Sequence, residues 1–161
     1  MFREMRRKRQ QLTDAECFEI LEKNTSGVLA VTGDDDYPYA VPLSYALDAN
    51  KIYFHCAKSG HKLDAIQRNC KASFCVIDQD LIVPAEYTTY FRSVIVFGKM
   101  RVVQDEQEKR TAIEKIAVKY APDDSVTGRQ QAIDREWDTL CILEMNMEHM
   151  TGKEAIELHR I

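Results

Sequence analysis

The sequence lacks the features that would place the chain in a membrane or in a disulfide framework. None of its apolar runs approaches the roughly 20 residues that span a bilayer. Its charged start has no apolar stretch of the kind found in signal peptides. The five cysteines are odd in number and include no C-x-x-C motif. We therefore expect a cytoplasmic protein in a reducing compartment, with no membrane contact.

Repeats, low-complexity segments and linkers are also absent, and 161 residues fit one domain spanning 1–161. The net charge of −4 gives no general reason to expect nucleic-acid binding. The exception is a basic N-terminal arm, residues 1–11, which contains Arg3 and the run from Arg6 to Arg9. This arm is either solvated or a contact for a polyanion or an acidic partner.

Local patterns predict a mainly β chain with flanking helices. Thr13 and Glu16 form a capping box, and Asp105 precedes Glu108 in the same way. The predicted helices are 13–23, 63–68, one that begins after Asp105, and 130–137. The predicted strands are 28–32, 39–47, 52–57, 72–77, 92–103 and 140–145. Segment 78–89, which contains Pro84, is expected to be less regular, and residues 150–153 are expected to form a turn.

The predicted strands favour a small antiparallel barrel. The first three are joined by short turns and are typical of an antiparallel meander. Pro42 lies inside the second strand and lacks an amide proton, so it marks an edge or a bulge. No G-x-G-x-x-G motif follows a strand, which argues against a Rossmann cofactor site.

The segment Ser59-Gly60-His61-Lys62 is a candidate anion site. Glycine lets backbone N–H groups converge, Lys62 adds a cation, and His61 can add a donor. The positive end of the helix that starts at Leu63 lies at the same place. The alternative is an ordinary surface turn. The S-x-x-K pattern of penicillin-binding enzymes is rejected, because its companion motifs and larger fold are missing.

His55 and Cys56 end the third predicted strand, and alternation puts them on opposite faces. One of them would face whatever the turn binds, although a strand histidine is often only structural. A zinc site of His55, Cys56 and His61 is weak, because adjacent strand residues diverge and no fourth ligand is evident. A Cys56 nucleophile would need a base that the sequence does not identify.

Aromatic residues surround two prolines in "YPYAVPLSYALD", Tyr37 to Asp48. Tyr39 and Tyr45 can lie against a flat ligand ring, or can reflect the general preference of aromatic residues for strands. Trp137, the single tryptophan, either covers a pocket or packs in a core or interface.

These segments resemble a known family. "KIYFHCAKSGHKLDAIQRNCKASFCVID", Lys51 to Asp78, is similar to the pyridoxamine 5'-phosphate oxidase-like flavoproteins, and most similar to their nitroimidazole-resistance (NimA-like) branch. "YPYAVPLSYALD" looks like the preceding strand of that family. "FRSVIVFGKMRVV" and "MTGKEA" look like a later strand and the closing turn.

The resemblance implies a six-stranded antiparallel split β-barrel that binds FMN at the interface of a homodimer. His61 and Lys62 match the basic pair that binds the phosphate. His55 matches a histidine placed beside the flavin and is the implied catalytic residue. Ser93 stands where the oxidases carry a flavin-contacting glutamine. The implied cofactor-binding residues are Pro42, Leu43, Ser44, Tyr45, His55, Cys56, Ala57, Gly60, His61, Lys62 and Ser93.

The resemblance further implies an FMN-dependent oxidoreductase that reduces a nitroaromatic or a related small acceptor, with NAD(P)H as a possible donor. His55 would donate a proton or a hydrogen bond to the acceptor, since imidazole titrates near neutrality. The alternatives are a non-catalytic flavin-binding or storage protein, a pyridoxamine-phosphate-oxidase-like enzyme with another substrate, and a barrel that binds haem or a deazaflavin.

Overall fold

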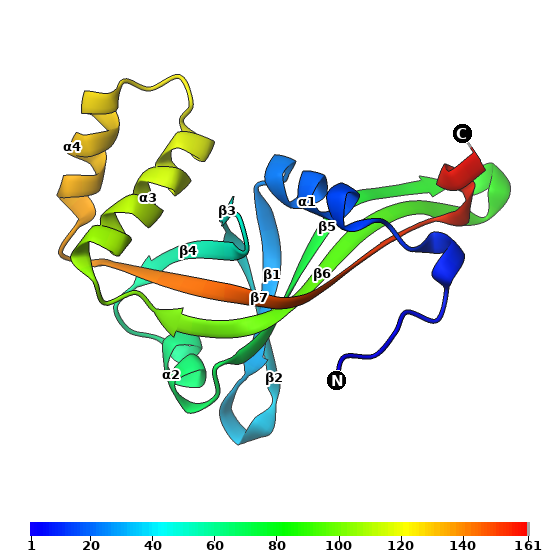
Figure 1. Cartoon of the computed structure of the whole chain (residues 1–161), viewed down its shortest axis with the longest axis horizontal. Coiled ribbons are helices and arrows are strands. Elements are labelled where there is room, and N and C mark those ends of the chain that lie inside the picture. Colours follow the sequence, from blue (N-terminus) through cyan, green and yellow to red (C-terminus); the bar gives the residue numbers. More distant parts are fainter. Residues whose placement is uncertain (161) are drawn as a thin grey trace.

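The computed structural model describes residues 1–160, and the fold is mainly β with flanking helices, as predicted (Figure 1). The strands are β1 (Ser26–Thr32), β2 (Pro38–Ser44), β3 (Ala46–Asp48), β4 (Lys51–Ala57), β5 (Lys71–Val83), β6 (Thr88–Val102) and β7 (Leu140–Glu154). The α-helices are α1 (Asp14–Lys23), α2 (His61–Arg68), α3 (Glu106–Tyr120) and α4 (Val126–Glu136). Short 3₁₀ turns are η1 (Lys8–Gln10), η2 (Asp34–Asp36), η3 (Pro84–Glu86) and η4 (Ile156–Arg160).

The strands form one antiparallel sheet in the order β2-β1-β5-β6-β7-β4-β3. It has seven strands in the described part of the chain, where six were predicted, because the segment 39–47 divides at Tyr45 into β2 and β3. The predicted meander is therefore wrong at this point. β2 and β3 lie at opposite edges of the sheet although a single residue joins them, so the sheet must curl until its two edges approach each other.

Tyr45, the residue between β2 and β3, is held in place by several contacts. Its side chain is fully buried, and its hydroxyl donates a hydrogen bond of 2.6 Å to the carbonyl of Leu21 at the end of α1. Its backbone N–H donates to the hydroxyl of Tyr120 at 2.9 Å, and the Lys119 ammonium lies 4.2 Å from the centre of its ring. Lys119 and Tyr120 are the last residues of α3. The contacts of Tyr45 therefore join α1 and α3 to the connection between the two edge strands.

Two groups of buried side chains fill the fold. The main cluster lies inside the curled sheet and includes Phe54, Phe74 and residues from α1 and α2. The second cluster lies between the other face of the sheet and α3, and includes Tyr53 and Ile142. The predicted capping box of Thr13 and the predicted cap at Asp105 are both confirmed.

Segment 78–89 is less regular at two points, a bulge between Ile77 and Gln79 and the turn at η3, but most of it is strand, and the turn predicted at 150–153 is wrong because those residues belong to β7. β5 and β6 continue through 78–89 as a long hairpin that turns only at η3, and β7 runs on beside it to Glu154. Together they make an arm that projects away from α3 and α4 (Figure 1). Several large apolar side chains of the arm are exposed, including Ile82 at 70% and Tyr87 at 98%.

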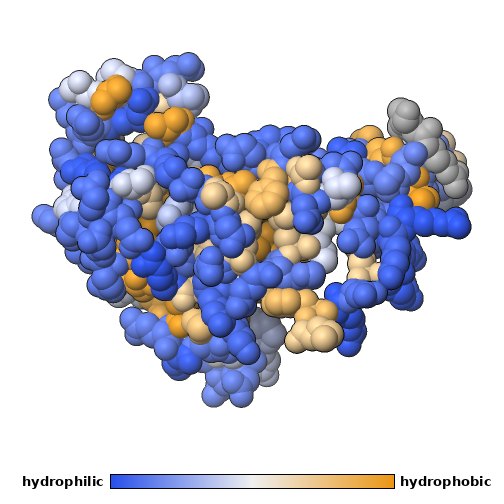
Figure 2. Space-filling view, in the orientation of Figure 1, coloured by the Kyte–Doolittle hydropathy of each residue, from blue (hydrophilic) through white to orange (hydrophobic). Residues whose placement is uncertain are grey.

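The N-terminal arm contacts the sheet through Phe2 and Gln11, although most of its side chains are exposed to solvent. The Phe2 ring stacks on His149 of β7, with the ring centres 4.7 Å apart and the planes 8° apart. Phe97 of β6 lies on the same face, 5.6 Å from Phe2. Apolar side chains gather across the middle of the face shown in Figure 2, between the helix pair and the hairpin arm.

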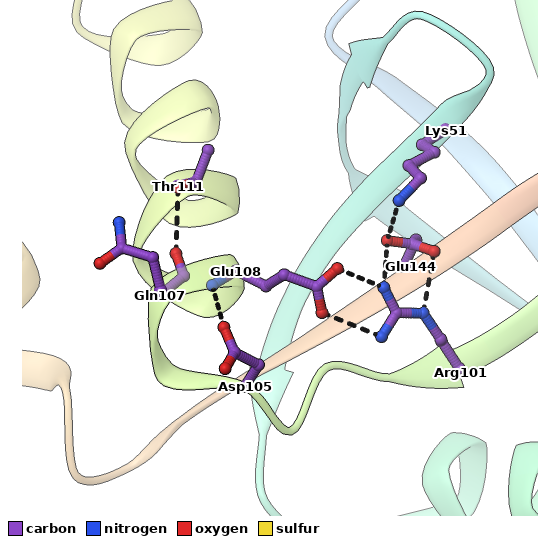
Figure 3. Close-up of polar contacts among 7 residues, drawn as sticks. All are labelled: Lys51, Arg101, Asp105, Gln107, Glu108, Thr111 and Glu144. Atoms are coloured by element: carbon purple, nitrogen blue, oxygen red, sulfur yellow. Dashed lines mark hydrogen bonds and ion pairs between the residues drawn. The ribbon is translucent and has the colours of Figure 1, made fainter.

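A buried carboxylate joins the sheet to the start of α3 (Figure 3). Glu144 of β7 accepts two hydrogen bonds from Arg101, at 2.9 and 2.7 Å, and one from Lys51 at 3.0 Å. Arg101 also forms a paired contact with Glu108, whose backbone N–H is capped by Asp105. Burial opposes ionisation of Glu144, but the bonds from Arg101 and Lys51 outweigh it and lower the pKa.

Within residues 1–160, the structure contains no helix that is long and apolar enough to cross a membrane.

The Glu144 contacts predict an acid-sensitive contribution to stability. A carboxylate with a lowered folded-state pKa stabilises the fold above its unfolded pKa, and this stabilisation is lost as the pH falls through the folded value. We expect Glu144→Gln to lower the free energy of unfolding at pH 7 by about 2 kcal/mol, the scale of a hydrogen bond to a charged group. The difference from the wild type should shrink as the pH falls below about 4, because Glu144 is then protonated in the unfolded wild-type chain and its ionised form favours folding less.

Urea unfolding followed by circular dichroism at several pH values measures both effects. The matched control is Glu148→Gln, since Glu148 pairs with Lys99 at 3.3 Å on the surface and its loss should cost less than about 1 kcal/mol. A difference at pH 7 that persists unchanged to pH 3 would contradict the assigned role of the Glu144 carboxylate.

Candidate functional site

The candidate site begins at two free sheet edges that face each other. β3 pairs with β4 only as far as Tyr53, so the last residues of β4 are paired on one side alone, with β7. β2 is the opposite edge of the sheet and pairs only with β1. Tyr45 joins the two edges, and β2 contacts β4 directly. Backbone N–H and C=O groups along both edges are thus open to a ligand.

The side chains at the end of β4 alternate between two faces, as predicted. Phe54 and Cys56 face the main cluster, and Cys56 is half-buried against it. His55 points to the face that α3 covers farther along, and is exposed. Within residues 1–160 its side chain makes no hydrogen bond or ion pair, so it is available to an external molecule.

The turn after β4 leaves donors free at the start of α2. Gly60 has φ of 137°, a conformation that favours glycine, and its carbonyl accepts bonds from Leu63 and Asp64. Among the four described α-helices, α2 is the one without a side-chain N-cap. The first N–H groups of a helix have no partners within it. The turn can therefore receive an anion at the positive helix end, where Lys62 adds a charge.

Lys62 and Cys56 act on each other electrostatically. Burial raises the pKa of the Cys56 thiol to about 12, the neighbouring Cys141 adds to this shift, and the charge of Lys62 opposes it. The Lys62 ammonium is therefore close enough to Cys56 for its charge to act on the thiol. A thiol with so high a pKa is protonated at neutral pH, which disfavours Cys56 as a catalytic nucleophile.

The side chain of His61 is engaged with the β1–β2 turn. Its ring lies against Tyr39, with the ring centres 4.1 Å apart, and its Nε2 accepts a weak hydrogen bond of 3.4 Å from the backbone N–H of Asp34. The Arg68 guanidinium donates to the same aspartate at 2.7 Å. This hydrogen bond from Arg68 and the nearby charge of His61 lower the pKa of Asp34. Lys62, in contrast, makes no hydrogen bond or ion pair within residues 1–160, so its ammonium is available at the start of α2.

The predicted residues on β2 occupy the free edge. Pro42 and Ser44 are exposed there, and Leu43 packs against the main cluster. The prediction that Pro42 marks an edge strand is confirmed. Tyr45 is placed differently, because its ring and hydroxyl are committed to the core and to Leu21. Its side chain cannot lie along a ligand, which corrects the expectation for this residue.

Ser93 is distant from the other predicted residues within the chain. It pairs with Lys153 on β7, whereas His55 pairs with Ile142 of the same strand. These positions are about 11 residues apart along β7, a contour distance of about 36 Å. Ala57, the last residue of β4, is exposed beside the turn. Of the predicted residues, Ser93 therefore lies apart from the turn after β4, and the side chain of Tyr45 lies in the core.

A cavity beside the turn adds residues that the sequence did not indicate. It has a volume of about 250 Å³, and its lining includes Lys58, Cys141 and Lys109. Lys109 is buried. Its ammonium donates a hydrogen bond of 3.1 Å to the backbone carbonyl of Trp137 and lies 4.1 Å from the centre of the Trp137 ring. Trp137 thus packs α4 against α3. Lys58 adjoins a motif that was visible in the sequence, but Cys141 and Lys109 come close only through strand pairing and helix packing.

The described residues contain no group of three or more His, Cys, Asp or Glu side chains placed to hold a metal ion. His55, Cys56 and His61 therefore do not assemble into the zinc site that was weighed from the sequence.

Comparisons with solved structures agree on the fold. The chain is similar to a candidate 5-nitroimidazole antibiotic resistance protein from Bacteroides thetaiotaomicron, with 20% identity, 89% of this chain and 86% of that chain covered, and a TM-score of 0.74. A conserved hypothetical protein from Mycobacterium tuberculosis shows 16% identity over 94% of this chain and 90% of its own, with a TM-score of 0.81. An FAD-binding protein from Mesorhizobium loti shows 24% identity over 91% and 97%, with a TM-score of 0.61.

No protein of curated function matches the sequence. The family model described as pyridoxamine 5'-phosphate oxidase matches residues 13–154, which is most of the chain. The match confirms the family predicted from the sequence. The chain belongs to the pyridoxamine 5'-phosphate oxidase family.

Proposed function

We propose that this protein is a flavin-dependent oxidoreductase that binds FMN between the free edges of β2 and β4. The observation that carries the proposal is the uncapped start of α2, where Gly60 and Lys62 create a site for a phosphate beside those edges. A helix N-terminus and a lysine together favour a phosphate dianion. The family to which the chain belongs supports a flavin as the molecule that carries this phosphate.

The donor set fits FMN in its other parts as well. The last residues of β4 and the edge of β2 offer backbone N–H and C=O groups to the polar rim of a flavin ring. Pro42 and Ala57 provide exposed, compact surfaces beside them. When bound, FMN supplies the electron transfer, and the protein supplies binding and orientation. The FAD-binding neighbour from Mesorhizobium loti makes FAD the second candidate cofactor.

We propose that the working form is a homodimer. The apolar arm supports this, because exposed side chains such as Ile77, Ile82 and Tyr87 are costly to leave in water. Ser93 lies on the same arm, far along the strand from the turn of its own chain. In a homodimer the arm of one copy can bring its Ser93 toward the turn of the other. This accounts for a predicted flavin contact that one chain alone does not assemble.

The proposed acceptor is a nitroaromatic or a related small oxidant, and the proposed donor is NAD(P)H. The similarity to the candidate nitroimidazole resistance protein supports the acceptor class through the fold. His55 is exposed and unpartnered within the described chain, so it can donate a proton or a hydrogen bond to a molecule held at the end of β4.

Absorption spectroscopy of the purified protein tests the proposal directly. We expect flavin bands to survive desalting after FMN is added, to bleach with NAD(P)H, and to recover when a nitroimidazole is supplied. Light scattering on the same sample should give twice the chain mass of 18.6 kDa.

Each other result has a distinct meaning. Retention of FAD instead of FMN would change the cofactor. Flavin that binds but does not bleach would indicate a binding or storage protein. A colourless protein that retains no flavin would overturn the proposal.

Replacing Lys62 tests the phosphate assignment. We expect Lys62→Ala to weaken FMN binding by about 1–3 kcal/mol, the scale of a lost charge-assisted hydrogen bond. Quenching of flavin fluorescence on titration measures the affinity. The matched control is Lys115→Ala, which removes a half-exposed lysine of α3 that pairs with Asp48 of β3. Equal affinities for the wild type and Lys62→Ala would show that the phosphate lies elsewhere.

Replacing His55 tests its proposed role as a proton donor. We expect His55→Ala to keep FMN bound while the rate of acceptor reduction falls about 100-fold, the lower end for a general acid. The control is His159→Ala, an exposed histidine near the end of the chain. Stopped-flow reoxidation of the reduced protein gives the rate. A parallel loss of flavin binding would instead make His55 a cofactor-binding residue.

A further inference from the structure

Two cysteines lie directly opposite each other at the inner end of the candidate site. Cys56 of β4 and Cys141 of β7 are partners in the antiparallel register. Both side chains face the main cluster, so they point to the same side of the sheet. Opposite residues in antiparallel strands have Cα atoms about 4.5–5.5 Å apart, which lies within the range for disulfides of about 4.4–6.8 Å.

The other cysteines have no such partner in the described structure. Cys17 is buried on α1, and its sulfur faces Gly152. Cys70 is exposed after α2, and Cys75 on β5 pairs with Val28 and Ile95. All five cysteines are free thiols in this structure.

A small molecule can reach the pair through Cys56, whereas the side chain of Cys141 is buried in the main cluster. Cys56 is half-buried beside the turn, so its thiol is the one that meets an external disulfide first. The two thiols also interact, because Cys141 contributes to raising the pKa of Cys56. A protonated thiol is a slow nucleophile, so the pair suits a slow and reversible exchange better than rapid catalysis.

We propose that Cys56 and Cys141 form a reversible disulfide within one chain by exchange with a low-molecular-weight disulfide of the oxidised glutathione class. The thiolate of one cysteine attacks the small disulfide, and one small thiol leaves as a mixed disulfide forms. The second cysteine then attacks the protein sulfur of that mixed disulfide, and a second small thiol leaves. Two protein thiols are oxidised, one small disulfide is reduced, and the two departing thiolates take up the two protons.

The bridge would tie the end of β4 to the start of β7. Cys56 follows His55 directly and precedes the turn that contains Gly60. The bridge would therefore restrict the motion of the end of β4, just before this turn. On the other side it would hold the segment that follows α4. This inference goes beyond the proposed flavin chemistry and does not depend on it, because the exchange requires no flavin.

Redox titration of the purified full-length protein tests the proposal. The native chain is equilibrated in mixtures of reduced and oxidised glutathione, its remaining thiols are alkylated, and its mass and peptides are measured. At the oxidising end we expect two alkylation sites to be lost, a peptide that links Cys56 to Cys141 to appear, and dithiothreitol to reverse both changes. The rate of oxidation should rise about tenfold per pH unit between pH 7 and 9, as the thiolate fraction rises.

Variants separate the pair from the other thiols. In Cys141→Ser, a glutathione adduct at Cys56 should accumulate, because no second thiol resolves it. Cys56→Ser replaces the more accessible thiol and should lose the linked peptide, while Cys75→Ser should oxidise like the wild type. A stable glutathione adduct at Cys56 in the wild type, a bridge between two chains, or oxidation only after unfolding would each overturn the proposal.

Discussion

The fold depends on one short connection, the single residue Tyr45 between the two edge strands β2 and β3. In a flat sheet of seven strands these two edges would be far apart. One residue can connect them only if the sheet curls. Burial of the Tyr45 ring and the hydrogen bonds to Leu21 and Tyr120 compensate for the sharp change of direction. Because those partners end α1 and α3, both helices close over the fold at the same corner.

The candidate site is a consequence of this closure. β3 is only three residues long, so the rest of β4 is left with an open edge opposite the open edge of β2. An open edge is normally a liability, since its unpaired backbone groups attract other strands. Here the exposed Pro42 on β2 and the turn after β4 limit such pairing. The same unpaired groups are then free to bind a small planar molecule.

The sequence predicted the features that depend on local chemistry. The caps at Thr13 and Asp105, the edge position of Pro42 and the glycine turn before Lys62 are all set by neighbouring residues. The sequence did not predict the arm, because the polar residues 78–80 interrupt the apolar alternation and only pairing with β6 makes them a strand. The placement of Tyr45 and the approach of Cys141 to Cys56 likewise depend on contacts between distant segments.

Alternation along β4 has a further consequence for the chemistry of the site. Cys56 packs against the main cluster on one face of the strand, and His55 is exposed on the other face. A ligand that rests on one face would meet only one of these groups. A ligand bound by its phosphate at Lys62 can contact both only by lying across the free edge of β4, where the strand stops at Ala57. Proton donation by His55 and thiol oxidation at Cys56 would then take place on opposite sides of one strand. Oxidation of Cys56 would therefore leave the surroundings of the His55 side chain unchanged.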